Sequence, residues 1–355
     1  MNMDPKYYKK IPGPAVVLDL EAFEKNLKLA EKMALAHGKL IRPHFKTHRC
    51  PGLALRQLGP AIKGMTCATV PEAEAVAQAG IKDILVANEV TTPEKIKRLV
   101  KLAQHARVLV GMDAPENAAA FSQAASRAGV QIGVLVDLDI GLGRCGARSI
   151  NAALKLAAYI KKLPALEFRG IMGYEGRHCA NEKDRGPRVQ QAMDTLQQTK
   201  AALIKNGHVV EIVSASGTST FNEALASKAI TEIQAGSYIS MEKNLAGLNL
   251  PFVCSVWVLA AVVSRSHQRV VVNSGRRTIG IEYGLPEVVK HTAQVTSVND
   301  EQSILRWKGA LPALGQGIFL RPSQVRSTFN LNETVWLVKK NRIVGSLPIT
   351  VKGSA

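Results

Sequence analysis

Short runs of apolar and β-branched residues alternate with helical patterns from about residue 40 to residue 245. Between the runs, apolar residues recur at helical spacing, with Pro93 and Pro115 at the starts of two predicted helices and Gly129 and Gly207 after the ends of two. The runs therefore predict eight buried strands separated by helices. These strands are Leu40–Lys46, Gly64–Thr69, Asp83–Asn88, Arg107–Asp113, Gln131–Asp139, Phe168–Glu175, Val209–Ser216 and Thr231–Ile239.

Strands that alternate with helices predict a parallel sheet, and eight such strands are the number that closes a barrel. The predicted fold class is therefore α/β, with a (β/α)8 TIM barrel over 20–247. An open, doubly wound sheet is the alternative. That fold usually has a glycine-rich GxGxxG turn after its first strand, and no such turn follows Leu40–Lys46.

The pattern changes near Leu250, where short strand-like runs follow one another with turns such as Val298–Asp300 between them. With no long helical pattern in this part, the sequence predicts a C-terminal antiparallel β domain over 248–355. Pro14–Asp19 reads as a further strand that pairs with it, so residues 1–19 are assigned to the same domain. The other runs are Val253–Val263, Arg269–Val272, Ala293–Ser297, Ile304–Trp307, Gly317–Leu320 and Thr334–Val338.

Composition adds a constraint on the class of protein. The 355 residues are 46% hydrophobic and 21% charged, which is typical of a folded chain. No apolar run reaches the roughly 18–20 residues of a membrane span, and the polar N-terminal segment does not read as a signal peptide. We therefore expect a cytoplasmic protein without a membrane partner.

The chain is basic, with 46 Lys and Arg against 28 Asp and Glu and a net charge of +18. The basic residues are spread along the chain and do not interleave with aromatic residues, which argues against a nucleic-acid partner. An anionic cofactor and substrate account for part of the charge. The five cysteines are widely spaced without a CxxC pair, which argues against a thiolate metal site.

Lys46 closes the first predicted strand, inside the segment Arg42–Cys50 (RPHFKTHRC). In a barrel the chemistry takes place at the carboxyl ends of the strands. A lysine at such a position is either an exposed strand-end residue or an amine that forms a Schiff base with an aldehyde. The ends of two other strands favour the second interpretation.

The seventh predicted strand ends in Ser214–Thr220 (SASGTST) and the eighth in Gln234–Tyr238 (QAGSY). Hydroxyl residues and glycine at the start of a helix present N–H and O–H groups to an anion. Barrels often bind phosphate with the loops after these two strands. Together with Lys46, they indicate a phosphorylated aldehyde, and pyridoxal 5'-phosphate fits.

With these segments, the sequence resembles the D-threonine aldolase and D-serine dehydratase family. These are fold-type III pyridoxal-phosphate enzymes related to alanine racemase, and the resemblance runs from about Pro14 to Pro286. The segments that carry it are Arg42–Cys50, Cys67–Glu74, Val86–Glu89, Asp137–Gly146 (DLDIGLGRCG), Gly173–Gly176, Ser216–Thr218, Gly236–Tyr238 and Gly280–Pro286.

The resemblance implies a role for each matching residue. Lys46 forms the Schiff base, Arg144 faces the phenolic oxygen of the cofactor, and Tyr174 lines the cofactor. Gln234 stands where this fold type places its partner for the pyridine nitrogen, and a neutral amide protonates that nitrogen weakly. The phosphate-binding residues implied are Ser216, Gly217, Thr218, Gly236, Ser237 and Tyr238.

Three histidines are acid–base candidates. His44 and His48 flank the lysine, and His178 stands one residue later than the histidine that the family carries after YEG. Asp137 and Asp139 stand two residues apart on one face of a strand, as two metal ligands would. We interpret them instead as support for Arg144.

The sequence departs from the family near its C-terminus. Family members carry a His, and two residues later a Cys or Asp, that bind a divalent metal beside the β-hydroxyl of the substrate. Gln324 and Arg326 occupy these positions, and the usual upstream Glu-His is missing around Leu311–Gln316. An arginine cannot be a metal ligand, so we predict no metal site. Arg326 then either polarises the β-hydroxyl or binds a second carboxylate of the substrate.

The leading prediction is a lyase that cleaves a β-hydroxy-α-amino acid by a retro-aldol reaction into an aldehyde and a smaller amino acid. A metal-independent amino-acid racemase is an alternative, although Val271–Asn273 stands where alanine racemases carry their second base, a tyrosine. A D-serine or 3-hydroxyaspartate dehydratase is another. A non-catalytic pyridoxal-phosphate carrier is a further alternative, but such carriers lack a β domain. By resemblance we also expect a homodimer.

Overall fold

The computed structural model describes residues 4–176, 178, 182–245 and 247–352. The chain divides into two compact units. The barrel unit consists of 30–46 and 54–236. The β unit consists of the described residues of 1–29, 47–53 and 237–354. The predicted barrel range, 20–247, therefore overlaps the barrel unit, while the segment 47–53 lies in the β unit although it directly follows Lys46.

Eight strands of the barrel unit form one sheet in the order β2-β9-β8-β7-β6-β5-β4-β3, and every pairing between neighbours is parallel. A parallel bridge between His44 and Thr66 links the segment after β2 to β3, so the two ends of the strand order meet. The strands are β2 (Leu40–Ile41), β3 (Met65–Cys67), β4 (Asp83–Val86), β5 (Arg107–Met112), β6 (Ile132–Leu138), β7 (Leu166–Gly173), β8 (Ile212–Ala215) and β9 (Glu232–Ile233).

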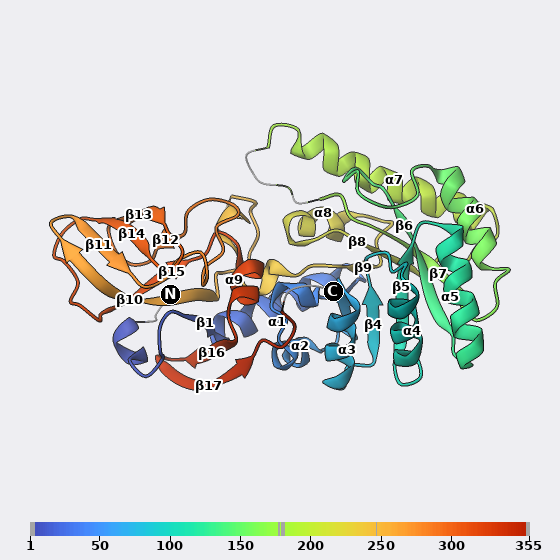
Figure 1. The fold of residues 1–355 in the computed structure, drawn as a ribbon. Helices are drawn as coiled ribbons and strands as arrows, with labels where there is room; N and C mark the ends of the chain where they lie inside the picture. The colour runs from blue at the N-terminus through green and yellow to red at the C-terminus, as the bar shows by residue number, and fades with distance from the viewer. Residues whose placement is uncertain (1–3, 177, 179–181, 246, 353–355) are drawn as a thin grey trace. The chain divides into compact units, whose positions relative to one another are not determined.

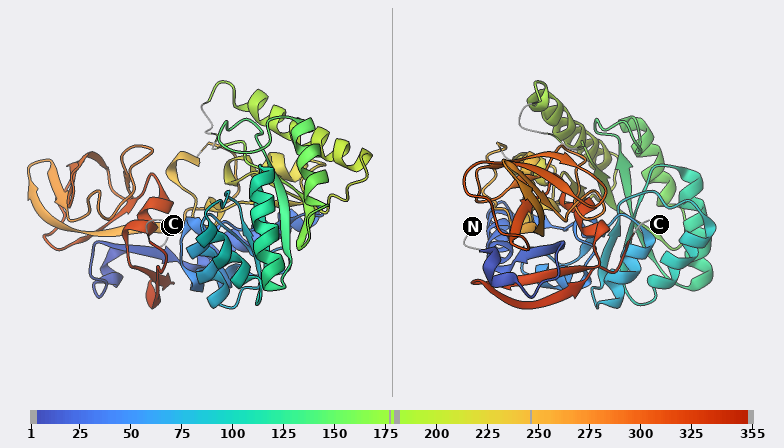
Figure 2. Two further views of the ribbon diagram at one scale, coloured as in Figure 1. Left: turned by 45° about the vertical axis from the view of Figure 1, so that its right-hand side comes forward. Right: turned by 60° about the vertical axis from the view of Figure 1, so that its left-hand side comes forward.

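Helices connect successive strands and lie along the outside of the sheet (Figures 1 and 2). Gly129 adopts φ of 66° and Gly207 φ of 77° just after two of them, the left-handed conformation that the sequence predicts at helix ends. The helices are α1 (Leu20–Ala36), α2 (Pro51–Gln57), α3 (Val70–Gln78), α4 (Pro93–Leu102), α5 (Pro115–Ala128), α6 (Ile150–Ile160), α7 (Arg185–Lys205) and α8 (Phe221–Ala226).

The inside of the barrel contains a cluster of apolar side chains from successive strands. Leu85, Leu109, Leu135 and Met172 are buried together. Gly111 provides space for this packing, because a Cβ atom at this position would lie 2.7 Å from Cε of Met172. The interior is therefore a packed core and not a pore, as in TIM barrels generally.

One buried arginine joins strands on both sides of the barrel closure. Nη1 of Arg42 lies 2.7 Å from Oδ1 of Asp83, the first residue of β4, and Nε lies 2.8 Å from Oε1 of Glu232, the first residue of β9. Burial by itself lowers the pKa of Arg42, but the two carboxylates outweigh it and raise the pKa overall. The guanidinium therefore stays charged and fixed between these strands.

The β unit is built on a nine-stranded sheet whose main path is β13-β14-β11-β10-β1-β16-β17. As predicted, β1 (Ala15–Asp19) pairs with this unit: it is antiparallel to β10 and parallel to β16. The remaining strands are β10 (Val256–Ser266), β11 (Arg269–Val272), β12 (Glu287–Val288), β13 (Ala293–Val298), β14 (Ser303–Trp307), β15 (Gly317–Arg321), β16 (Thr334–Lys339) and β17 (Arg342–Pro348).

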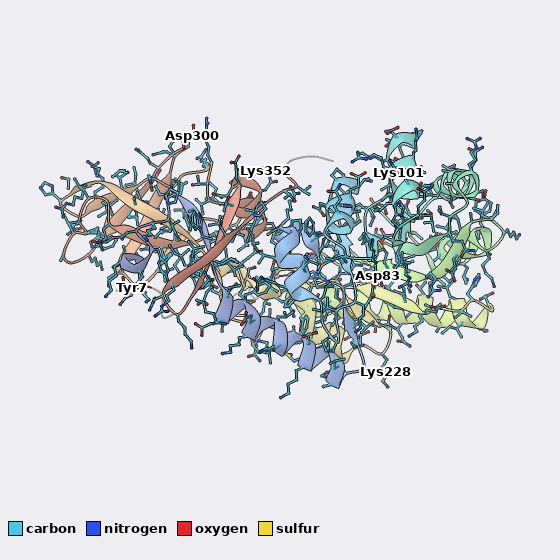
Figure 3. All side chains as sticks on the ribbon, turned by 90° about the horizontal axis from the view of Figure 1, so that it is seen from below. Tyr7, Asp83, Lys101, Lys228, Asp300 and Lys352 are labelled. Atoms are coloured by element: carbon cyan, nitrogen blue, oxygen red, sulfur yellow. The ribbon has the colours of Figure 1, made fainter. Side chains whose placement is uncertain are left out.

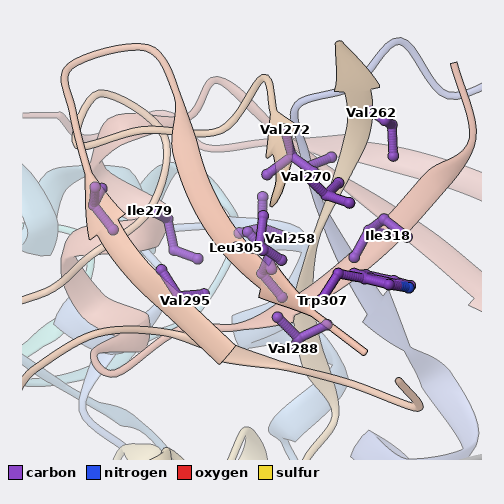
Figure 4. Packing of buried hydrophobic residues seen from close by; sticks show 13 residues of the cluster. Val258, Val262, Val270, Val272, Ile279, Val288, Val295, Leu305, Trp307 and Ile318 are labelled. Carbon is purple, nitrogen blue, oxygen red and sulfur yellow. The ribbon is translucent and has the colours of Figure 1, made fainter. Parts of the chain in front are cut away.

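The apolar residues of this sheet form a continuous core (Figure 4). Val258, Val270, Leu305 and Ile318 come from four strands and are almost fully buried around Trp307. Alternate side chains of a strand point to opposite faces, so one face of each strand supplies this core. This core stabilises the sheet, and the loops of the unit begin and end at its strands.

The predicted fold class, a (β/α)8 barrel with a C-terminal β domain, is confirmed. Several details differ from the prediction. The eighth strand is Glu232–Ile233 and does not extend to Ile239, and β12 was not predicted. The first strand ends at Ile41, so Lys46 lies in the 3-10 turn Phe45–Thr47. The β domain contains a short helix, α9 (Val325–Leu331), and the strand Arg342–Pro348, both absent from the prediction. It is also not wholly antiparallel, because β1 and β16 run in the same direction.

Among the described residues, no helix has the length and apolar character needed to cross a membrane. Lysines lie on more than one face of the barrel unit. Figure 3 shows Lys101 and Lys228, both exposed, on separate faces of the barrel unit. The positive charges of these two residues therefore lie apart on the surface of the unit.

Arg42 and Arg107 both bind Asp83, and the burial of Arg42 predicts that its substitution destabilises the protein far more. Arg42→Met leaves Glu232 buried without its cation and should lower the free energy of unfolding by about 3–5 kcal/mol. Arg107→Met is the control, because the Arg107 side chain is 45% exposed and its Nη1 lies 3.0 Å from the same Asp83. We expect about 0–1 kcal/mol for the control. Urea denaturation measures both, and equal losses would contradict the importance of burial.

Candidate active site

The residues predicted to bind the cofactor follow five strands that are consecutive in the sheet, β2-β9-β8-β7-β6. Because these strands are parallel, their carboxyl ends lie at the same end of the barrel. Lys46 follows β2, Tyr174 follows β7 and Arg144 lies in the loop after β6. Gln234 and Gly236 follow β9, and Ser216, Gly217 and Thr218 follow β8.

Lys46 and Tyr174 lie close together at this end. The ammonium nitrogen of Lys46 lies 6.0 Å from the centroid of the Tyr174 ring, over its face. This distance is at the limit of a cation–π contact. Lys46 is half-buried in its 3-10 turn. The amine therefore stands beside an aromatic side chain, as expected where a flat cofactor is bound.

The loop after β8 has the features of an anion cradle. Ser216 adopts φ of 68°, which turns the chain sharply into the short 3-10 helix Thr218–Thr220. The hydroxyl oxygen of Thr218 is buried and has no hydrogen-bond partner among the described residues. A buried hydroxyl without a partner costs about 1–3 kcal/mol. A phosphate oxygen would satisfy it, so the residues present fit pyridoxal phosphate.

Glu175 supports this loop from β7. Its carboxylate accepts a hydrogen bond from the hydroxyl of Thr220. Burial raises the pKa of Glu175, while the hydrogen bond from Thr220 lowers it in part. Thr220 also accepts a hydrogen bond from the backbone N–H of Gly217 at 3.3 Å. Glu175 therefore holds the shape of the cradle.

The turn after β9 is held in a different way. Nε2 of Gln234 donates to Oγ of Ser214 at 3.0 Å and to its carbonyl oxygen at 3.3 Å, which fixes the amide next to β8. In the β unit, the hydroxyl of Ser237 donates to Oε1 of Glu242 at 2.7 Å. Tyr238 is fully buried in that unit. The predicted phosphate roles of Ser237 and Tyr238 stay predictions.

Arg144 lies in an exposed loop beside a group of carboxyl groups from three strand ends. Burial, a hydrogen bond with Glu89 and the nearby charge of Asp113 raise the pKa of Asp137, whereas Arg144 lowers it. Asp139 instead accepts hydrogen bonds from the backbone N–H groups of the same loop. Asp137 and Asp139 therefore have different partners. The positive charge of Arg144 lowers the pKa of Asp137.

The two histidines beside Lys46 have different surroundings. The backbone of His44 pairs with Ala235 and with Thr66, so this histidine is fixed in the barrel closure. His48 is buried in the β unit, where its Nδ1 accepts a hydrogen bond from the backbone N–H of Cys50. Burial lowers the pKa of His48 to about 3. His48 is therefore neutral near pH 7, and its predicted acid–base role stays a prediction.

His178 is buried at the end of β7. Its Nδ1 lies 3.0 Å from Oε2 of Glu182, and its backbone N–H donates to Oγ of Ser219 in the β8 loop. Its Nε2 is buried and has no hydrogen-bond partner in the part of the chain that the structure describes. The neighbouring Arg177 lies outside the described residues. His178 therefore has the arrangement of an oriented general base.

The positions predicted to replace the metal ligands lie in the β unit, where Gln324 directly precedes α9. Oriented for hydrogen bonding, the Gln324 amide accepts from Nη2 of Arg326 at 3.2 Å and donates to Oε2 of Glu282 at 3.2 Å. Within the described residues, no three His, Cys, Asp or Glu side chains group together around a possible metal. A guanidinium repels a cation, so these residues do not fit the divalent metal of the family.

Comparison with known proteins identifies the family. Residues 18–243 match a family described as "Alanine racemase, N-terminal domain", and 255–338 match a "Putative serine dehydratase domain". A D-threonine aldolase from Arthrobacter sp. is 35% identical over 97% of this chain and 93% of its own length. This chain belongs to the alanine racemase and D-threonine aldolase family.

Two further relatives support membership of this family. A 3-hydroxy-D-aspartate aldolase from Paracoccus denitrificans is 30% identical over 97% of this chain and 93% of its own. The crystal structure of a D-threonine aldolase from Filomicrobium marinum matches with a TM-score of 0.93 and 33% identity over 96% of both chains. The predicted family, the pyridoxal-phosphate cofactor and the lyase class are confirmed.

The family motifs did not reveal every residue of this site. Glu175, Glu182 and Glu282 received no role from the sequence, although Glu175 closes the predicted strand Phe168–Glu175. Each acts through another side chain, namely Thr220, His178 and Gln324 respectively. A position at the end of a predicted strand was a signal for Glu175. Nothing local in the sequence marks the partners of the other two.

In this family member, the carboxyl cluster predicts a change of stability with pH. The pKa of Asp137 is raised in the folded state, so its contribution is fully present below about pH 4 and is lost as the pH rises through the native pKa. The free energy of unfolding should fall by up to about 1.4 kcal/mol per pH unit over that interval. Asp137→Asn should remove this slope, as measured by urea denaturation from pH 4 upward. Asp194→Asn on exposed α7 should keep it.

Substitution of Thr218 should lower the affinity for the cofactor without lowering the stability of the protein. Thr218→Val removes a hydroxyl without a described partner, so the cofactor-free protein should be as stable as wild type. Cofactor affinity should fall about tenfold or more, the usual value for a hydrogen bond to a charged group. Thr66→Val is the control, because Oγ1 of Thr66 donates to the carbonyl oxygen of Arg42 at 3.1 Å. It should lose stability and keep its affinity, and a reversed pattern would argue against the cradle.

Proposed function

We propose that this chain cleaves the Cα–Cβ bond of a β-hydroxy-α-amino acid in a retro-aldol reaction and needs no divalent metal. The arrangement of Lys46 beside Tyr174, at the end of the barrel where the Thr218 loop fits a phosphate, carries the proposal. The products are an aldehyde, from the β-carbon, and a smaller amino acid. The substrate is a small amino acid, and the D-configuration follows from the family resemblance.

In this reaction the base removes the proton of the β-hydroxyl group, and the Cα–Cβ bond breaks as the carbonyl forms. Pyridoxal phosphate, when bound, supplies a sink for the electron pair left on Cα. The amine of Lys46 would hold the cofactor, and Arg144 would face its phenolic oxygen. A proton added to Cα completes the smaller amino acid.

His178 is our candidate for the base. When Nδ1 carries its proton toward Glu182, Nε2 presents a lone pair that can accept the proton of the β-hydroxyl. Its backbone hydrogen bond to Ser219 ties the histidine to the loop that holds the phosphate. His44 stays a second candidate, because it lies two residues before Lys46 in the barrel closure.

The surroundings of Asn273 do not favour the racemase alternative. Its Oδ1 accepts a hydrogen bond from the backbone N–H of Ala261 at 2.7 Å, and its Nδ2 donates to the carbonyl oxygen of Gly13 at 3.1 Å. The side chain at this position therefore connects β10 with the segment before β1. A dehydratase would expel hydroxide, which is difficult without a Lewis acid, and Arg326 is not one.

We also infer from the resemblance that the protein works as a homodimer in the cytoplasm. The family match over 18–243 supports the dimer by analogy. The charge of +18 suits an anionic cofactor and an acidic substrate in part. Size-exclusion chromatography with light scattering tests the dimer.

A product assay tests the proposed function. The enzyme is incubated with D- and L-β-hydroxy amino acids, first with chelator and then with added Mn²⁺ or Mg²⁺. Aldehyde and a smaller amino acid should form equally with chelator and with metal. A keto acid with ammonia would indicate a dehydratase, and an inverted enantiomer a racemase. Activity only with added metal would contradict metal independence.

The same assay includes variants of two lysines. Lys46→Ala should abolish both the visible absorbance of the lysine-bound cofactor and product formation. Lys63→Ala, an exposed lysine of the same unit, should retain both. If Lys46→Ala kept the absorbance, Lys46 would not be the attachment point.

A further inference from the structure

Glu175 is a buried acid of the barrel unit to which the proposed reaction gives no role. It is 2% exposed and lies two residues after the end of β7. Its Oε1 accepts a hydrogen bond from the hydroxyl of Thr220, whereas Oε2 is buried and has no hydrogen-bond partner among the described residues. A buried carboxylate with an unsatisfied oxygen is costly. The arrangement therefore favours a neutral carboxyl group that carries its proton on Oε2.

Two hydrogen bonds connect Glu175 to the phosphate cradle, which lies on the same unit. The N–H of Gly217 donates to Oγ1 of Thr220 at 3.3 Å, and the hydroxyl of Thr220 donates to Oε1 of Glu175. Gly217 stands between Ser216 and Thr218, whose hydroxyl oxygens are both buried without a described partner. The carboxyl group of Glu175 is therefore separated by one hydroxyl group from the loop that fits the phosphate.

The charged side chains near this loop have other partners. Arg185 of α7 binds Glu223 of α8, with Nη1 2.6 Å from Oε1. Nδ1 of His178 lies 3.0 Å from Oε2 of Glu182. Burial raises the pKa of Glu175, and the charge of His178 is among the weaker effects that lower it. Neither Arg185 nor His178 therefore satisfies Oε2 of Glu175.

Two further charged residues lie at the same end of the barrel. On the side of β6, Oδ1 of Asp139 accepts from the N–H groups of Gly141 at 3.1 Å and Gly143 at 2.9 Å. On the other side, the ammonium nitrogen of Lys46 lies 6.0 Å from the ring centroid of Tyr174. The nearer contacts of both groups are thus to residues other than Glu175.

A phosphate in the cradle brings a second anion close to this carboxyl group. A phosphate ester carries about −1.5 to −2 charges at pH 7. Two anions close together in a buried site repel each other, and one of them then keeps a proton. Phosphate oxygens would face hydroxyl and N–H donors, which favour their charged form, whereas Oε2 of Glu175 has no described donor. The proton therefore goes to Glu175.

We propose that Glu175 takes up a proton on Oε2 when a phosphate group occupies the Ser216–Thr218 loop, and thereby sets the pH range in which the cofactor is held. The proton comes from the solvent and returns to it when the phosphate leaves. Glu175 acts through Thr220 and is thus a positioning residue for the cofactor. The inference does not depend on which amino acid is cleaved.

Proton uptake makes the affinity for the phosphate depend on pH. Above the pKa that Glu175 has in the cofactor-free protein, each bound phosphate requires one proton. The affinity then falls as the pH rises, by up to about tenfold per pH unit. Because burial raises that pKa, the fall begins at a higher pH than for an exposed glutamate. A phosphate ester has its own second pKa near about 6, so it adds little slope at higher pH.

Calorimetry with pyridoxine 5'-phosphate on the cofactor-free, full-length chain measures the uptake. This probe carries the phosphate group but no aldehyde, so Lys46 forms no Schiff base with it. Titrations from about pH 7 upward, in two buffers of different ionisation enthalpy, give the number of protons bound. Wild type should take up as much as about one proton more per phosphate than Glu175→Gln. The affinity of Glu175→Gln should change little with pH.

Glu167→Gln is the matched control for the calorimetry. Glu167 lies on the same strand, its side chain is 52% exposed, and its Oε1 lies 2.8 Å from Nη1 of Arg169. This variant should take up as many protons as wild type. If Glu175→Gln binds the probe more weakly but takes up as many protons as wild type, Glu175 has only a structural role and the proposal is wrong.

Infrared spectroscopy of the holoenzyme locates the proton. The C=O stretch of a protonated carboxyl group should appear, shift in heavy water and be missing in Glu175→Gln. Asp137→Asn should keep this band, because the raised pKa of Asp137 gives that residue a band of its own. A band that Glu175→Gln retains in full would overturn the proposal. If Glu175→Gln does not fold, the wild-type protein decides alone: a loaded protein without any protonated carboxyl band contradicts the proposal.

Discussion

The parallel closure of the barrel is the constraint on which the candidate site depends. Eight short strands run in one direction, so their carboxyl ends must meet at one end of the barrel. The closure rests on few backbone contacts, because β2 and β9 each contain two residues. The buried guanidinium of Arg42, bound to Asp83 and Glu232, adds a fixed electrostatic link at this place. Lys46 follows four residues later, so its position depends on this link.

The polar groups at this end of the barrel fall into two kinds. Some have partners within the protein, as the Gln234 amide nitrogen has in Ser214 and Oε1 of Glu175 has in Thr220. Others are buried without a described partner, as the Thr218 hydroxyl and Nε2 of His178 are. Buried polar groups usually find partners in folded proteins. The first kind therefore builds the site, and the second kind indicates where a ligand is expected.

The β unit carries the change that separates this chain from the family pattern. The local fold of the loop before α9 is fixed by Ser323 and Thr328, which are not themselves the altered positions. Gln324 and Arg326 could therefore replace metal ligands without loss of the loop. The guanidinium of Arg326 repels a cation, so the loop keeps its fold but does not fit the divalent metal of the family.

The sequence alone determined the alternation of strands and helices, the lysine motif and the family, because periodicity and short motifs are local properties. The altered positions Gln324 and Arg326 were also visible in it. Only the tertiary structure decided which side chains meet. It placed Lys46 in a turn beyond its strand, buried His48 as a neutral side chain, and brought Glu182 to His178 and Glu282 to Gln324. Burial and contacts between distant residues depend on packing of the whole chain, and no local pattern records them.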